Sequence, residues 1–168
     1  SNTLLEALPP GAKGWRVLPV LGRRADPARV FGEALEAAGL APEPPKHWSQ
    51  EHVLNAVRRA AAQTPKSYGG VLVFVDEMGK FLEAAAQDRA DIYFFQQLAE
   101  EASRSGGRLV VIGILHQAIE QYAHRVSQDK RDEWAKIQGR FVDLPINIAP
   151  DEQIDLIARA IDVEGPPK

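Results

Sequence analysis

Two adjacent carboxylates, Asp76 and Glu77, directly follow the unbroken apolar run Val71–Val75. A continuous apolar run is typical of a parallel strand that is buried on both faces of its sheet. Side chains that follow such a strand lie at its carboxyl end, where open α/β sheets bind ligands. There an aspartate can hold Mg²⁺ and a glutamate can polarise a water, as phosphoryl transfer requires. The alternatives are an acidic strand end or a helix N-cap at Asp76.

Lys80, His116 and Gln117 could contribute to the same chemistry. Lys80 follows Glu77 by one helical turn, so it could pair with a carboxylate, touch a phosphate or be a solvated lysine at a helix start. His116 and Gln117 end a second apolar run, Leu109–Leu115. Either side chain could bind the γ-phosphate or the attacking water, or could simply cap the next helix.

The motif that would normally complete such a site is missing. The phosphate-binding sequence G-x-x-x-x-G-K-S/T occurs nowhere in the chain. Its backbone amides and lysine supply most of the phosphate affinity in proteins that carry it. We therefore expect this chain to bind ATP very weakly and to lack ATPase activity by itself.

Composition narrows the remaining possibilities. The chain of 168 residues suits one domain, 1–168, and its 45% hydrophobic content can form a sizeable core. A net charge of −3 does not indicate nucleic acid, although a local basic patch stays possible. There is no cysteine and no apolar run of membrane-spanning length, so a cytoplasmic location is expected. The opening Ser1-Asn2 is typical of a remnant of tag cleavage and indicates an engineered fragment.

Strands are predicted to alternate with helices, which indicates an α/β sheet. Unbroken apolar runs predict central strands at Val71–Val75 and Leu109–Leu115. Proline predicts peripheral strands at Trp15–Leu21 and Phe141–Ile148. Helices are expected over 26–38, 49–62, 79–87, 92–103, 118–126, 132–137 and 151–161, with a polar break at 127–130.

This layout resembles the AAA+ class of P-loop ATPases. Val71–Glu77 matches their hhhhDE pattern, His116 or Gln117 falls at the sensor position, and Gly139-Arg140-Phe141 is similar to their arginine-finger segment. The resemblance implies a three-layer sandwich with a mostly parallel sheet of about four strands. It also implies Mg²⁺ and ATP as ligands of the full-length parent, and self-association in which Arg140 acts on a neighbouring ATPase subunit. The helical stretch between sensor and finger is longer than usual.

In the AAA+ strand order 5-1-4-3-2, strand 1 and the phosphate loop would precede residue 1. Because an open gap would leave backbone groups unpaired, either Phe141–Ile148 pairs directly with Leu109–Leu115 or a second copy of the chain pairs or swaps into the space. Pro145 disfavours long pairing on one side, so we favour the direct pairing. A closer resemblance is to large bacterial ATPases, some of which lie in phage-defence islands of the bacteriophage-exclusion type. It is carried by three segments, namely Val75–Leu82, Gly113–Gln117 and Glu133–Phe141.

Two other functions compete with this hypothesis. The first is a non-catalytic α/β interaction module, in which Asp76 and Glu77 are structural. The second is a Mg²⁺-dependent nuclease or Toprim-like domain, which would need further acids at strand ends, and none follows Leu21 or Leu115. The aromatic residues 93–95 are expected in the core. A small basic-aromatic cluster or a solvated helix face is expected near residue 134. It comprises Lys130, Arg131, Trp134 and Lys136.

Overall fold

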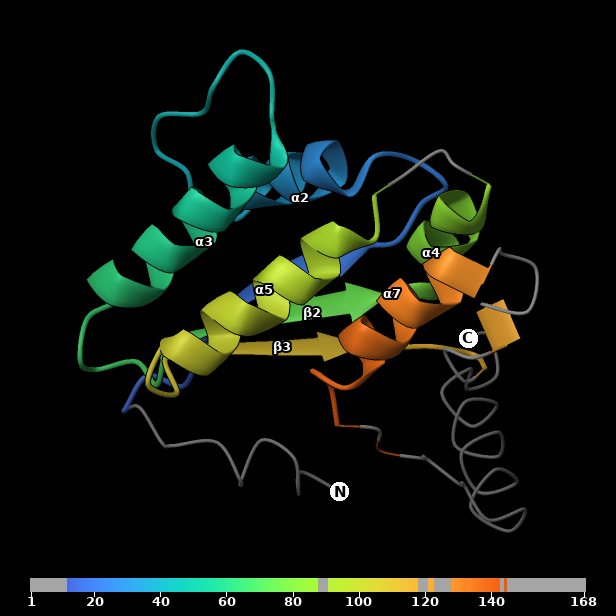
Figure 1. Ribbon diagram of the computed structural model, residues 1–168. Coiled ribbons are helices and arrows are strands. Elements are labelled where there is room, and N and C mark those ends of the chain that lie inside the picture. Colours follow the sequence, from blue (N-terminus) through green and yellow to red (C-terminus); the bar gives the residue numbers. More distant parts are fainter. Residues whose placement is uncertain (1–11, 88–90, 118–120, 123–127, 143, 145–168) are drawn as a thin grey trace, which may run out of the picture.

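The computed structural model describes residues 12–87, 91–117, 121–122, 128–142 and 144. Strands and helices alternate along the chain in the predicted way (Figure 1). The elements are β1 (Arg16–Leu21), α2 (Pro27–Ala37), α3 (Gln50–Gln63), β2 (Val71–Asp76), α4 (Gly79–Ala86), α5 (Tyr93–Arg104), β3 (Leu109–Gly113) and α7 (Gln128–Gln138). The α/β class is therefore confirmed. None of the described helices is long and apolar enough to cross a bilayer.

The three strands form one parallel sheet in the order β1-β2-β3. Arg16, Val71 and Leu109 stand in register at one end, and Leu21 stands opposite Asp76 at the other. The central position of Val71–Val75 and the neighbouring position of Trp15–Leu21 are confirmed. The predicted order places Trp15–Leu21 beside Val71–Val75, with Leu109–Leu115 on the other side of that strand. The three described strands have this order.

Pro19 shows why β1 can lie at an edge. The amide of Arg16 donates to the Gly70 carbonyl (3.0 Å), and the amide of Gly22 donates to the Asp76 carbonyl (2.8 Å). Every second residue from Arg16 to Gly22 thus turns its amide toward β2. Pro19 is one of the residues between them, whose amide positions point away from β2. Its missing N–H costs no bond to β2, because that position faces away from the neighbouring strand.

Two helix starts follow directly from their capping residues. Asp26 accepts a hydrogen bond from the amide of Ala28 (3.1 Å), and Pro27 occupies the first helical position of α2. Ser49 accepts from the amide of His52 (3.2 Å) at the start of α3, and the His52 ring closes a capping box. Both caps lie where the sequence predicts them.

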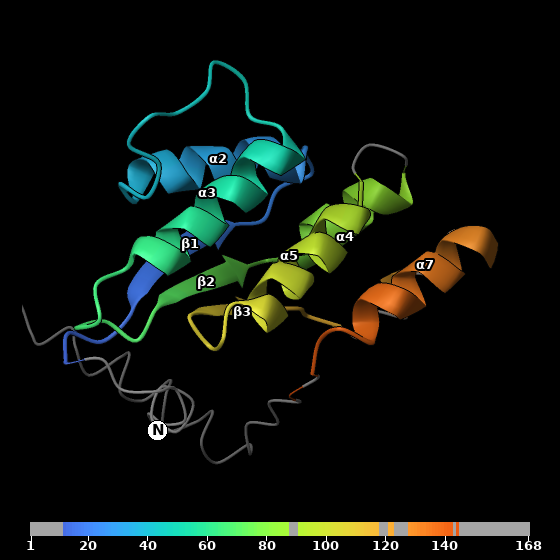
Figure 2. The same cartoon turned by 60° about the vertical axis from the view of Figure 1, so that its left-hand side comes forward.

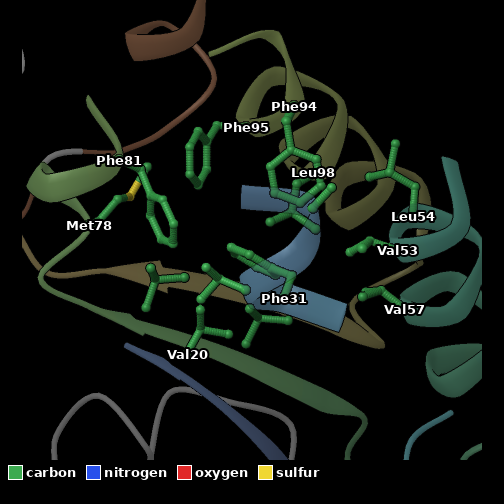
Figure 3. Packing of buried hydrophobic residues seen from close by; sticks show 14 of the residues in the cluster. Val20, Phe31, Val53, Leu54, Val57, Met78, Phe81, Phe94, Phe95 and Leu98 are labelled. Carbon is green, nitrogen blue, oxygen red and sulfur yellow. The ribbon is translucent and has the colours of Figure 1, made fainter. Parts of the chain in front are cut away.

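The hydrophobic core lies between the sheet and the helices on one of its faces. Figures 1 and 2 show α2, α3 and α5 on the same side of the sheet. Phe31 is fully buried among Phe81, Phe94 and Phe95, and its ring meets that of Phe94 edge-on at 4.9 Å between centroids (Figure 3). Phe94 and Phe95 are core residues as expected, whereas Tyr93 is 50% exposed, so its core assignment is wrong.

The opposite face of the sheet is less covered. Val17 and Leu21 on β1 are 51% and 52% exposed, because alternate side chains of a strand point to opposite faces. The described elements form two layers rather than the predicted three-layer sandwich, and three strands rather than about four. Within them β3 is an edge strand, with most of its residues half-buried, so a central position for Leu109–Leu115 is not seen.

Other differences concern the C-terminal part. The predicted strand Phe141–Ile148 lies mostly outside the described residues, and its described members, 141, 142 and 144, are not in a strand. The helix expected at 132–137 begins earlier, at Gln128, so the predicted polar break at 127–130 is wrong for residues 128–130. Residues 1–11 and 145–168, including the predicted helix 151–161, lie outside the described residues, as does most of the predicted helix 118–126.

Candidate functional site

Asp76 and Glu77 lie at the carboxyl end of the central strand, between the ends of β1 and β3. Asp76 is exposed, and its Oδ1 accepts a hydrogen bond from the amide of Glu77 (2.8 Å). That bond orients the carboxylate beside the turn that follows β2. The pair therefore occupies the edge at which parallel α/β sheets bind ligands.

Glu77 has an unusual backbone conformation. Its φ of 51° is in the left-handed region, which non-glycine residues rarely adopt and which often occurs at functional sites. The turn packs tightly against the end of β1, because a Cβ atom at Gly22 would lie 2.1 Å from the Glu77 carbonyl oxygen. Glycine at position 22 thus allows the Asp76–Glu77 turn to approach the neighbouring strand.

Lys80 is an immediate partner of Glu77. Its Nζ forms an ion pair with Glu77 Oε2, and its amide donates to the Glu77 carbonyl (3.0 Å). The two side chains are 44% and 32% exposed. The sequence left open whether Lys80 pairs with a carboxylate, touches a phosphate or is only solvated. In this structure it pairs with Glu77.

The end of β3 is attached to the same turn. The amide of Ile114 donates to the Val75 carbonyl (2.9 Å), and the amide of Met78 donates to the Ile114 carbonyl (3.0 Å). His116 and Gln117 follow within three residues and are exposed. They therefore emerge on the same edge of the sheet as Asp76 and Glu77.

Tyr122 is a site residue that sequence reasoning missed. It is 8% exposed, and its hydroxyl packs against Gly79, where an added Cβ would lie 2.2 Å from the oxygen. Burial raises the pKa of the Tyr122 phenol, and nearby Glu83 raises it further. Hydrogen bonding with the Gln117 side chain and the His116 backbone acts in the opposite direction. Tyr122 thus links the segment after β3 to the start of α4.

Arg140 pairs with a residue of α5 and not with Asp76 or Glu77 of its own chain. Its Nη2 lies 3.0 Å from Oε1 of Glu100 on α5, and Arg104 pairs with the same carboxylate at 3.6 Å. Trp134 on α7 is 2% exposed and belongs to the core, so both alternatives for this residue, a basic-aromatic cluster and a solvated helix face, are wrong. Arg131 and Lys136 are exposed.

Asp76 is an exposed carboxylate that could serve as one ligand of a hard cation. In the described part of the chain, no group of three or more His, Cys, Asp and Glu side chains could enclose a metal ion. Mg²⁺ commonly uses one or two carboxylates and completes its shell with water and phosphate oxygens. An exposed aspartate at a sheet edge fits that mode of binding.

Fold and site together define an α/β protein with a parallel sheet and an acidic turn at the carboxyl end of its central strand. A scan against protein-family models, a search of curated proteins and a search of solved structures each give no match.

Proposed function

We propose that this chain carries the metal- and water-handling part of an ATP-hydrolysing domain of the P-loop, AAA+-like type. The observation that carries the proposal is the acidic turn Asp76–Glu77 at the carboxyl end of a buried central strand. His116 and Gln117 emerge at the same edge, as a phosphate sensor would require. Because the sequence has no phosphate-binding loop, that loop must be supplied from outside these 168 residues.

Each residue would have a separate role in this proposal. Asp76 would hold Mg²⁺, which would supply positive charge against the phosphates of bound ATP. Glu77 would orient the attacking water, and its left-handed backbone would keep the carboxylate beside Asp76. Gln117, held by Tyr122, or His116 would contact the γ-phosphate, and Lys80 would touch a phosphate or stay paired with Glu77.

A second candidate function is a non-catalytic interaction module. The ion pair between Glu77 and Lys80 favours it, because a carboxylate oxygen that binds Lys80 is not free to orient a water. In this alternative, Asp76 and Glu77 only stabilise the turn after β2.

The experiment that separates the two functions uses cation binding and turnover. Mn²⁺, added to the isotopically labelled chain, should broaden the amide signals of residues around Asp76, and Asp76→Asn should abolish this effect. Asp91→Asn is the matched control, because Asp91 is an exposed acid at a helix start. In a protein extended upstream by a phosphate loop, Asp76→Asn should abolish Mg²⁺-dependent ATP hydrolysis. Absence of turnover in the extended protein, together with no Mn²⁺ effect around Asp76, would favour the interaction module. Turnover that survives Asp76→Asn would show that Asp76 does not hold the catalytic metal.

A further inference from the structure

The amino-terminal edge of the sheet, opposite the acidic turn, is strongly basic. Three segments lead into the three strands there, namely 12–16, 64–70 and 104–108. They contain five cations and no acid, in a chain whose net charge is −3. Because the first residues of the strands stand in register, the segments meet at one end of the sheet (Figures 1 and 2). The cations are Lys13, Arg16, Lys66, Arg104 and Arg108.

Tyr68 lies between the cations of this edge. The amide of Lys13 donates to the Ser67 carbonyl (2.8 Å), and its Nζ lies 6.0 Å from the centre of the Tyr68 ring. On the other side, Arg108 donates to the carbonyl of Tyr68 (3.1 Å). Tyr68 is half-buried, so it is held in place through its backbone by Arg108 and carries a partly accessible side chain beside Lys13.

A groove continues the basic edge along α3 and α5. It has a volume of about 440 Å³, and Arg58, Arg104 and Arg108 line it together with Glu101. Arg58 holds Glu101 through two hydrogen bonds (2.7 and 2.6 Å). Arg58 thus pairs with the acid in the groove, and Arg104 pairs with Glu100 at its border (3.6 Å). Arg108 adds a positive charge that is held by the backbone carbonyls of residues 64, 68 and 69.

We propose that this basic edge binds a single strand of nucleic acid through its phosphates. The three segments lead into neighbouring strands, which lie about 5 Å apart, so their cations are spread across the sheet edge along a line that an extended backbone can follow. Phosphate contacts from lysine and arginine supply affinity without base specificity. The Tyr68 ring adds a surface on which a base can stack, as single-strand-binding proteins use. The proposal is independent of the ATPase hypothesis, because the two surfaces lie at opposite ends of the strands.

The test is a fluorescence anisotropy titration of the 168-residue chain with a labelled deoxythymidine oligomer. The oligomer should exceed the roughly 4–16 nucleotides that such sites cover. Lys13→Gln with Lys66→Gln removes two exposed charges of the basic edge. Arg29→Gln with Lys46→Gln is the matched control, because it removes two exposed charges elsewhere. A duplex of the same length is titrated in parallel.

We expect binding at low salt, with an affinity that falls as salt is raised by a log–log slope of about −0.7 per phosphate contact. The basic-edge variant should lose affinity on the order of tenfold at low salt, with a shallower slope, and the control variant should bind like the wild type. Absence of binding at low salt, or equal losses in both variants, would overturn the proposal. Tighter binding of the duplex would overturn its single-strand part.

Discussion

The ammonium group of Lys80 is paired with the carboxylate of Glu77, one helical turn after the strand that delivers Glu77 to the sheet edge. Both side chains are partly exposed, so the pair contributes little to stability, about 1 kcal/mol or less. Its larger consequence is chemical. The carboxylate oxygen that binds Lys80 is occupied, so Glu77 can orient a water through that oxygen only if Lys80 moves away when a nucleotide phosphate is present.

The first prediction concerns Glu77 in a protein that includes a phosphate loop. Glu77→Gln should retain ATP binding while hydrolysis falls by about 10²–10⁴-fold, because the amide cannot accept a proton from water. The measurement is steady-state phosphate release, together with nucleotide affinity by calorimetry. Glu83→Gln on the next helical turn is the control and should turn over normally. Wild-type turnover in the Glu77 variant would make that residue structural.

The second prediction concerns the chain alone. Its 168 residues contain no phosphate loop, so calorimetry with Mg²⁺ present should detect at best very weak ATP binding, and no phosphate release. A micromolar dissociation constant would contradict this prediction and would require another phosphate-binding element within the chain.

The third prediction tests the close approach at Gly22. Gly22→Ala should lower the free energy of unfolding by about 1–3 kcal/mol, because the new Cβ would overlap the Glu77 carbonyl oxygen and force the turn to move. Urea unfolding measures the change. Gly139→Ala is the control, since a Cβ there would lie at an ordinary 3.5 Å from its nearest neighbour. Equal stabilities of the two variants would show that the turn accommodates the methyl group.

Local signals in the sequence predicted much of the fold. The apolar run before Asp76 identified the central strand, Pro19 identified an edge strand, and Asp26 and Ser49 marked helix starts. Each of these signals depends on a residue's own backbone chemistry or on its immediate neighbours. They are therefore visible before any tertiary structure is known.

Features that depend on packing between distant segments were not predicted. Trp134 looked like part of a surface cluster, because charged residues surround it in the sequence, but α7 packs against α5 and buries it. Tyr122 joins the site only because Gly79, 43 positions earlier, leaves room for its hydroxyl. No spacing rule connects those two positions. Sequence periodicity also could not reveal that the described helices cover one face of the sheet.

The fourth prediction follows from the raised pKa of Tyr122. Because the folded state favours the neutral phenol, stability should be unaffected below pH 10 and should fall as the pH rises above that value, where the unfolded chain ionises first. The tyrosinate absorbance of the wild type minus that of Tyr122→Phe should titrate with a midpoint above 10. In denaturant the midpoint should return to about 10. An unchanged midpoint in the folded protein would mean that the hydroxyl is well solvated.

The last prediction concerns Arg140, which pairs with Glu100 in its own chain and is 47% exposed. If Arg140 also serves a neighbouring subunit, Arg140→Ala in the loop-containing protein should lower turnover by about 10³-fold or more. Stability should change by no more than about 1 kcal/mol, because the pair with Glu100 is at the surface. A mixture of Glu77→Gln and Arg140→Ala subunits should then regain activity, since some interfaces combine an intact Glu77 with an intact Arg140. If the mixture is no more active than its components, while each subunit still assembles with wild type, Arg140 does not act across the interface.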